Sequence, residues 1–334
     1  MPPQTNEAAP AFKSVGYIGL GAAGYSMASN LPKAGFQLVV HDVEIAKARK
    51  AASEWKNTTA SDGRPEAFAD CEVIITMLPN GKVVREALLG DSGIARALKP
   101  GTIIIDTSSS SPFDTIALGK ELAQHSLELI EAPITQTYMH ATDHGESTLM
   151  VGADKKEVYE KASPVLQTMG SYVFLMGPLG HGHAMKTINN YVMASSLVAL
   201  CDSVIAGQKY GLDPQQMIDV LNVGTGVNFQ TLDPFRRDAL TKRYNSGFGL
   251  ALLVKDLGIT HQFMAHNGIE TELPGLLRGY LSEALGRVDP MADHTAALEG
   301  WEKKSGVNVD KTERVKDIPR EDFEHRLKGL NRKD

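Results

Sequence analysis

Residues 15–35, VGYIGLGAAGYSMASNLPKAG, decide the fold of this chain. The first six residues read as a buried strand, and AGYSMASNLPKAG reads as a helix whose last turn we expect Pro32 to disturb. Between them the glycines of GLGAAG have the spacing G-x-G-x-x-G. After a strand and before a helix, this motif is typical of a loop that binds the phosphates of a dinucleotide.

The three glycines of this loop have separate roles. Gly19 suits the tight turn, Gly21 lets the backbone approach a pyrophosphate, and Gly24 permits close packing of the helix on the strand. The alternative is a tight strand–helix turn that binds no ligand. The residues that we expect to bind the cofactor here are Gly19, Leu20, Gly21, Ala22, Ala23 and Gly24.

An acidic residue ends the second predicted strand, QLVVHD. Asp42 stands 18 residues after Gly24, and a carboxylate there accepts hydrogen bonds from the adenosine ribose and repels a 2′-phosphate. Because VEIAKAR places no arginine directly after it, NAD is favoured over NADP. The alternative is that Asp42 caps the helix beginning in VEIAKARK, and one carboxylate can do both.

Short apolar strands alternate with helical segments over residues 14–177. After QLVVHD come CEVIITMLP, GTIIIDTS, LELIEAP, STLMVG and YVFLMG. The pattern predicts the α/β class, with an N-terminal Rossmann-type doubly wound, mostly parallel sheet. Residues 178–304 read as an all-α domain for substrate binding and oligomerisation, opening with a long apolar helix from about residue 181. Residues 1–13 are expected to be a leader, and the charged residues 305–334 a C-terminal extension.

Composition excludes several classes of function. A net charge of -6 and a pI near 5.9 argue against nucleic acid or an anionic membrane as the partner. The start of the chain lacks the apolar core of a secretory signal, and no uninterrupted apolar run reaches membrane-spanning length. Cys71 and Cys201 lie in apolar segments and are expected to be buried thiols. We therefore expect a soluble cytoplasmic protein.

A nicotinamide-dependent enzyme needs a group that exchanges the proton of the alcohol or carbonyl. Lys186 in GHAMKTINNY is the candidate, with Asn190 one turn further along the same helix face. Burial lowers a lysine pKa towards neutrality, which suits a general acid or base, and Asn190 would orient the lysine or bind the substrate oxygen. The alternative is an ordinary solvated lysine.

Seven motifs in one order and spacing resemble the β-hydroxyacid dehydrogenase family. They are YIGLGAAGYSMASNLPKAG, TMLP, IIDTSSSSP, EAP, STLMVGA, GHAMKTINN and LLVKDLGI, and they extend from about residue 14 to about residue 300. That family contains 3-hydroxyisobutyrate dehydrogenases and tartronate semialdehyde reductases. The resemblance implies a homodimer or homotetramer, in agreement with a long helix too apolar for a small domain to cover.

The resemblance also implies roles for single residues. Lys186 becomes the catalytic lysine and Asn190 its companion, while Leu78 and Pro79 line the path of the dinucleotide. Ser109 stands where the family contacts the nicotinamide ribose. Lys255 in VKDLG matches a lysine that the family brings towards the cofactor. From chemistry alone, Lys255 and its neighbour Asp256 read as a solvated helix pair.

The predicted substrate turn departs from the family pattern. After D/E-A-P the family has Ser-Gly-Gly, whose amides and hydroxyl hold the substrate carboxylate, whereas this chain has Thr135, Gln136 and Thr137. Thr135 keeps a hydroxyl, but the loss of two glycines makes the turn bulkier. We therefore expect Thr135, Gln136, Thr137, Lys186 and Asn190 to bind a substrate that differs from the family's usual one.

A metal site is the competing interpretation of this region. His140, Asp143 and His144 follow the substrate turn, and His181 and His183 begin the long helix. No helix signal places the first set on one face, and the H-x-H spacing suits one metal poorly. We expect no metal.

The predicted activity is an NAD-dependent interconversion of a 3-hydroxy acid, such as 3-hydroxyisobutyrate, with its semialdehyde or 3-oxo acid. The alternatives are a tartronate semialdehyde reductase, a dehydrogenase of a larger 3-hydroxy amino acid, and, in a different class, a non-catalytic NAD-binding scaffold.

Overall fold

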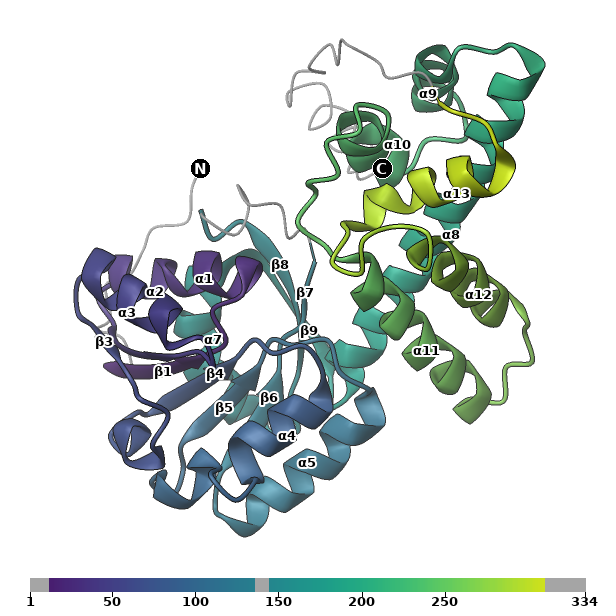
Figure 1. Cartoon of the computed structure of the whole chain (residues 1–334). Helices are drawn as coiled ribbons and strands as arrows, with labels where there is room; N and C mark the ends of the chain where they lie inside the picture. Colours follow the sequence, from purple (N-terminus) through teal and green to yellow (C-terminus); the bar gives the residue numbers. More distant parts are fainter. Residues whose placement is uncertain (1–11, 136–143, 310–334) are drawn as a thin grey trace, which may run out of the picture. The chain divides into compact units, whose positions relative to one another are not determined.

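A computed structural model describes residues 12–135 and 144–309 and divides the chain into two compact units. The first unit comprises Met1–Ala194 and Gly247–Gly279, and the second comprises Ser195–Ser246 and Tyr280–Asp334. These limits differ from the boundary near Gly177 that the sequence suggests, because the first unit also takes in the start of the long helix and one later helix. Figure 1 gives the order of the elements along the chain.

A mostly parallel sheet forms the centre of the first unit. Its strands lie in the order β3-β2-β1-β4-β5-β6-β8-β7, and β9 pairs with β8. The first part of this order is that of a doubly wound dinucleotide-binding sheet, so the predicted fold class is confirmed. The strands are β1 (Ser14–Ile18), β2 (Gln37–His41), β3 (Thr58–Ala60), β4 (Val73–Thr76), β5 (Ile103–Asp106), β6 (Glu128–Glu131), β7 (Ile134–Thr135), β8 (Ser147–Gly152) and β9 (Gly170–Gly177).

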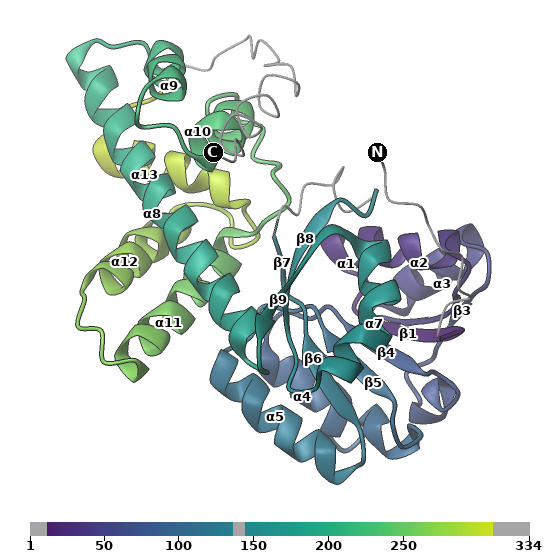
Figure 2. The ribbon, with the colours of Figure 1, turned by 180° about the vertical axis from the view of Figure 1, so that it is seen from behind.

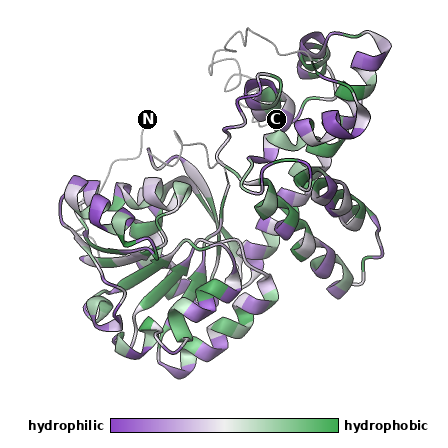
Figure 3. Ribbon diagram, viewed as in Figure 1, coloured by the Kyte–Doolittle hydropathy of each residue, from purple (hydrophilic) through white to green (hydrophobic). Residues whose placement is uncertain are grey.

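Helices cover both faces of this sheet because its central strands are apolar on both sides. Tyr17 and Val73 pack with helices α1, α2, α3 and α7, whereas Ile74 and Ile104 pack with α4 and α5. The two layers are visible in Figure 1 and from behind in Figure 2, and Figure 3 shows the apolar strands between them. The helices are α1 (Ala22–Ala28), α2 (Asn30–Lys33), α3 (Ile45–Glu54), α4 (Gly81–Leu89), α5 (Pro112–Gln124) and α7 (Lys156–Met169).

Two local features refine the sequence interpretation. The helix after the glycine loop is divided at Ser29, because Pro32 has no N–H to donate to the carbonyl of Ala28. Strand β8 is antiparallel to β6 and β7. Because β6 and β7 are both antiparallel to β8, these two strands run in one direction and β8 runs in the other.

Helices make up the part of the described chain that follows β9. Helix α8 (His181–Tyr210) begins in the first unit and ends in the second. Helix α11 (Leu250–His266) belongs to the first unit, and α12 (Leu273–Leu285) crosses from the first to the second. The second unit also holds α9 (Pro214–Val223), α10 (Phe229–Leu232) and α13 (Ala297–Ser305). Short helical turns complete the described elements, at Pro65–Phe68 and Ile94–Ala97 in the first unit and at Phe235–Ala239 and His294–Ala296 in the second.

By length and composition alone, helix α8 is long and apolar enough to cross a membrane. In its most apolar 18-residue segment, 44% of the residues are buried within the chain. Lys186, Asn189 and Asn190 interrupt its first half, and both asparagines have hydrogen-bond partners inside the first unit. A helix that is apolar on most sides and carries paired polar groups is typical of a protein core.

The glycine loop gives a test of packing. A methyl group on Gly24 would lie 2.2 Å from the carbonyl oxygen of Gly19, whereas a methyl group on Gly21 would have no neighbour within 4 Å. We expect Gly24→Ala to lower the free energy of unfolding by about 2 kcal/mol through overpacking. Gly21→Ala, the matched control, should change it by less than about 0.5 kcal/mol in the same urea titration. Equal losses in the two variants would contradict this packing.

Candidate functional site

The glycine loop has room on the side where a pyrophosphate would lie. Gly19 adopts a φ of 104° and donates its N–H to the carbonyl of His41 at 2.9 Å. That φ is one that side chains disfavour, and Gly24 lies directly against the turn. Gly21 faces open space, and Gly21 and Ala22 are exposed. The loop therefore fits the predicted dinucleotide.

Asp42 connects the end of β2 to this loop. Its Oδ2 accepts the Leu20 N–H at 2.7 Å, and its Oδ1 accepts the Glu44 N–H at 2.8 Å. The N-cap of α3 is Glu44, so the alternative that Asp42 caps this helix is wrong. The carboxylate binds backbone amides on both sides instead, and it still has lone pairs for ribose hydroxyls.

The loops after β4 and β5 are joined to each other and to α11. The Leu78 N–H donates to Ser108 Oγ at 2.9 Å. Lys255 Nζ donates to the carbonyls of Pro79 at 3.0 Å and Ser109 at 2.7 Å. One ammonium group thus holds the two loops on which the predicted nicotinamide-side residues stand.

Lys255 and Asp256 are not a solvated pair, contrary to the interpretation from chemistry alone. Their side chains are 26% and 5% exposed, and Lys255 Nζ lies 3.1 Å from Asp256 Oδ1. The reason is that Lys255 donates to two carbonyls on loops that lie 176 and 146 residues earlier in the sequence. Helix periodicity alone gives no signal for such a contact.

Lys186 and Asn190 lie on the first half of α8, next to this pair. Asn190 Nδ2 donates to Asp256 Oδ2 at 2.6 Å. Lys186 is half-buried, and burial lowers its pKa to about 8, while the charge of Asp256 raises it and that of Lys255 lowers it further. At neutral pH both protonation states of this amine are therefore accessible.

Asn189 is a residue that the sequence reasoning missed. Its Nδ2 donates to Asn190 Oδ1 at 3.0 Å and to Thr135 Oγ1 at 3.4 Å. It thus connects the predicted catalytic pair to the first residue of the predicted substrate turn. The doubled asparagine in KTINN was the available signal. Gln136 and Thr137 lie outside the described residues.

Glu131, from the EAP motif, holds the beginning of α8. Its Oε1 accepts the N–H groups of Gly180 at 2.6 Å and Gly182 at 2.9 Å. Burial raises its pKa to about 7, although the backbone hydrogen bonds act in the opposite direction. The sequence reasoning used this residue only as part of a motif, because a contact over 49 residues leaves no local pattern.

The histidines considered for a metal have different environments. His181 is exposed, whereas His183 is buried and within hydrogen-bond distance of Thr115 and Ser108. No group of three or more His, Cys, Asp or Glu side chains suited to a metal occurs within residues 12–135 and 144–309. His140 and Asp143 lie outside those ranges.

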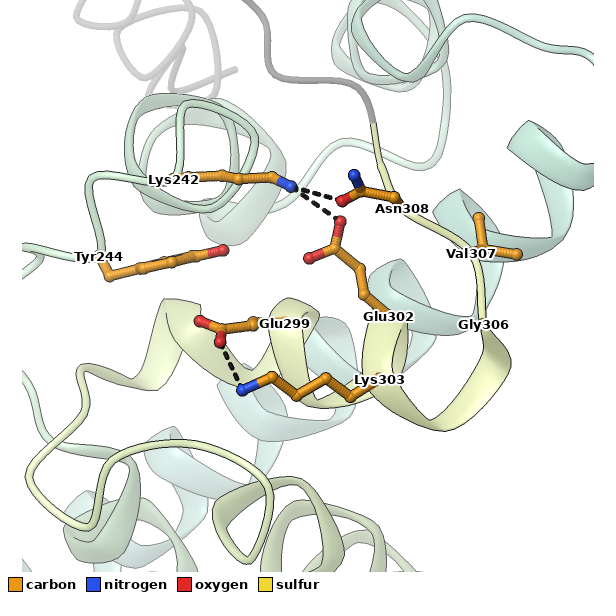
Figure 4. Close-up of a pocket in the computed structure, with 8 residues that line it drawn as sticks. All are labelled: Lys242, Tyr244, Glu299, Glu302, Lys303, Gly306, Val307 and Asn308. Carbon is orange, nitrogen blue, oxygen red and sulfur yellow. Dashed lines mark hydrogen bonds and ion pairs between the residues drawn. The ribbon is translucent and has the colours of Figure 1, made fainter.

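A cavity of about 470 Å³ is lined by residues of the second unit, whereas the predicted site residues all belong to the first. Figure 4 shows its charged side chains in pairs. Lys242 lies 3.1 Å from Glu302, and Lys303 lies 2.6 Å from Glu299. Because each charge is compensated, the cavity offers no group prepared for proton exchange. Its lining residues are Lys242, Tyr244, Glu299, Glu302, Lys303, Gly306, Val307 and Asn308.

Comparison with known proteins agrees with the geometry of the first unit. Residues 14–177 match the NAD binding domain of 6-phosphogluconate dehydrogenase, and residues 180–301 match a domain described as NAD-binding of NADP-dependent 3-hydroxyisobutyrate dehydrogenase. The chain is also 30% identical to 2-(hydroxymethyl)glutarate dehydrogenase of Eubacterium barkeri over 299 residues, 88% of this chain and 97% of that one. The chain belongs to the β-hydroxyacid dehydrogenase family.

Other members of the family extend this similarity. Human mitochondrial 3-hydroxyisobutyrate dehydrogenase is 33% identical over 303 residues, 88% of this chain and 85% of that one. The structure of Mycobacterium tuberculosis 3-hydroxyisobutyrate dehydrogenase with L-serine has a TM-score of 0.76 at 27% identity and covers 86% of this chain and 98% of that one. As a β-hydroxyacid dehydrogenase, the protein is an oxidoreductase that acts on CH–OH groups with a nicotinamide cofactor.

The buried carboxyl of Glu131 predicts a pH dependence of stability. Because the fold raises its pKa from 4.5 to about 7, the folded state holds this proton more tightly than the unfolded chain. Its contribution is fully present below pH 4.5 and is lost as the pH rises through about 7. Glu131→Gln keeps an acceptor for the two amides and removes the titration.

We expect the difference in unfolding free energy between wild type and Glu131→Gln to fall by about 3 kcal/mol between pH 4.5 and pH 7. Urea titrations at several pH values measure it. The exposed Glu157→Gln on α7 is the control, and its difference from wild type should stay nearly constant. A flat difference for Glu131→Gln would disprove the assignment.

Proposed function

We propose that this β-hydroxyacid dehydrogenase interconverts a 3-hydroxy acid and its semialdehyde or 3-oxo acid with NAD, and that Lys186 exchanges the proton. The observation that carries the proposal is the half-buried amine of Lys186, whose pKa of about 8 suits both directions near neutral pH. Its surroundings connect through Asn190 and Asn189 to Thr135 in the predicted substrate turn.

The reaction removes a proton and a hydride from the alcohol. A nicotinamide cofactor held by the glycine loop would supply the acceptor for the hydride of the carbinol carbon. In this direction the neutral amine of Lys186 takes the hydroxyl proton, and in the reverse direction its ammonium form returns a proton to the carbonyl oxygen. Lys186 ends oxidation as an ammonium group, and loss of that proton to solvent completes the balance.

Asn190 orients the substrate oxygen in this proposal. One of its two amide hydrogens is bound to Asp256, and its oxygen accepts from Asn189. The second amide hydrogen has no role in these two contacts and is available to the substrate. Since the contacts fix the rotamer of Asn190, that hydrogen has a defined direction.

The compounds named with the relatives share one chemical frame. 3-Hydroxyisobutyrate, 2-(hydroxymethyl)glutarate and L-serine are all 3-hydroxypropanoates that differ in the substituent at C2. We infer that the substrate has this frame and that the turn beginning at Thr135 selects the substituent. A C2 hydroxyl corresponds to the alternative of tartronate semialdehyde reduction, and an amino group to the alternative of a 3-hydroxy amino acid.

NAD is favoured over NADP by the charges at the end of β2. Asp42 and Glu44 are both acidic, and Lys47, the nearest lysine along the chain, is paired with Glu44 at 2.7 Å. A 2′-phosphate there would meet the negative charge of Asp42, and residues 43–48 supply no arginine to bind it. A homodimer or homotetramer and a cytoplasmic location stay predictions from the sequence.

Lys186→Ala should lower kcat about 10²- to 10⁴-fold while NADH binding, measured by fluorescence, changes little, because the lysine exchanges a proton and does not hold the cofactor. In the wild type, kcat/KM for oxidation should rise with pH and level off above about 8, and kcat/KM for reduction should fall above about 8. Lys120→Ala, at an exposed lysine of α5, is the control. Undiminished turnover in Lys186→Ala would leave the non-catalytic scaffold as the better interpretation.

Asp42→Asn should reduce the preference for NAD over NADP about tenfold, or about 1.4 kcal/mol. The amide removes the charge that repels a 2′-phosphate and keeps one acceptor oxygen for the backbone. The measurement is the ratio of kcat/KM values for the two cofactors with one substrate. Asp70→Asn, at an exposed aspartate before β4, should leave the ratio unchanged. An unchanged ratio in Asp42→Asn would refute the role of this charge.

A further inference from the structure

His183 is a fully buried histidine with a partner on each side of its ring. Its Nε2 lies 3.0 Å from the carbonyl oxygen of Ser108, and its Nδ1 lies 2.8 Å from Thr115 Oγ1. A carbonyl oxygen only accepts, so Nε2 carries the hydrogen. The histidine on α8 therefore donates to the loop between β5 and α5.

The protonation state of the ring follows from its surroundings. Burial lowers the pKa of His183, and the charge of Lys255 acts in the same direction. The carboxylates of Asp106, whose Oδ2 lies 3.9 Å from Nε2, and Asp256 act against it, as does the Ser108 hydrogen bond. Burial thus favours the neutral ring, and hydrogen on Nε2 leaves Nδ1 as an acceptor. The single hydrogen of the Thr115 hydroxyl then has two acceptors within reach, Nδ1 at 2.8 Å and the carbonyl oxygen of Ser111 at 3.0 Å.

The peptide that His183 reaches is held from several sides. The Ser108 N–H donates to Asp106 Oδ1 at 3.0 Å, and the Ser108 Oγ accepts the Leu78 N–H at 2.9 Å. The next carbonyl, that of Ser109, accepts from Lys255 Nζ at 2.7 Å. Helices α8 and α11 thus each bind one of two successive carbonyls in the loop predicted to contact the nicotinamide ribose.

We propose that His183 is a positioning residue, which fixes the distance between Lys186 and the Ser108–Ser109 peptide. His183 and Lys186 are three residues apart on α8 and so lie on neighbouring positions of one helix face. The hydrogen bond from His183 to the Ser108 carbonyl fixes how far this face of α8 lies from the loop between β5 and α5. The inference rests on the proposed function, in which the loop faces the nicotinamide and Lys186 exchanges the proton.

A role in stability alone is the competing explanation, since buried polar groups are normally hydrogen-bonded. The two explanations predict different activities for variants that keep a hydrogen-bonding group at the place of Nε2 and variants that keep one only at the place of Nδ1. The amide nitrogen of His183→Gln can occupy the place of Nε2 and donate to Ser108. His183→Asn reaches only the place of Nδ1 and leaves the Ser108 carbonyl without this donor. His183→Met fills the space and has no donor.

His183→Asn and His183→Met should lower kcat about 10- to 100-fold, because loss of alignment at the reacting atoms costs this much. His183→Gln should stay within about threefold of wild type by the same reasoning. Binding of ADP-ribose, which lacks the nicotinamide, should be the same in all of them, because the glycine loop and Asp42 are unchanged. In wild-type protein without cofactor, ¹⁵N NMR should show His183 as the neutral tautomer with hydrogen on Nε2.

The same substitutions at His125, exposed at the end of α5, are the controls and should leave kcat and ADP-ribose binding at wild-type values. Equal losses of kcat in His183→Gln and His183→Asn, losses that follow the free energy of unfolding, or hydrogen on Nδ1 would each overturn the proposal. Failure of the proposed function is seen separately, as full turnover in Lys186→Ala.

Discussion

The carboxyl of Glu131 at the beginning of α8 is the contact on which the site depends. It joins the carboxyl end of β6 to the amide of Gly180, just before α8, and to that of Gly182, in its first turn. A methyl group on Gly182 would lie 2.2 Å from the Met150 carbonyl oxygen. These contacts therefore fix the position of the first turn of α8 relative to the sheet. Because α8 rises 1.5 Å per residue without interruption, this start fixes where Lys186 lies.

A second constraint comes from α11, which approaches the same edge of the sheet from a later part of the chain. Lys255 binds carbonyls of the loops after β4 and β5, and Asp256 binds Asn190 on α8. A buried charge is costly unless it is paired and hydrogen-bonded. These pairings make the relative positions of α8, α11 and the two loops depend on one another within the first unit.

The sequence predicted the features that have a local pattern. The glycine spacing, the alternating strands and the GHAMKTINN motif lie within short windows, and they gave the fold class and the family. Lys255 on two carbonyls and Glu131 on α8 were not predictable in this way, because their partners lie between 49 and 176 residues away. The antiparallel β8 and the N-cap at Glu44 were missed because each depends on how neighbouring segments pack.

The pKa of Lys186 is lowered mainly by burial, and it stays low because Asp256 shares its charge with other groups. Burial alone lowers the pKa of a lysine, and a carboxylate devoted to Lys186 would raise it again. Here Oδ1 of Asp256 faces Lys255 and Oδ2 accepts from Asn190, so its charge compensates Lys186 only in part. The same Lys255 that holds the two loops adds a positive charge that favours the neutral amine. The network that positions the lysine therefore also keeps its pKa near 8.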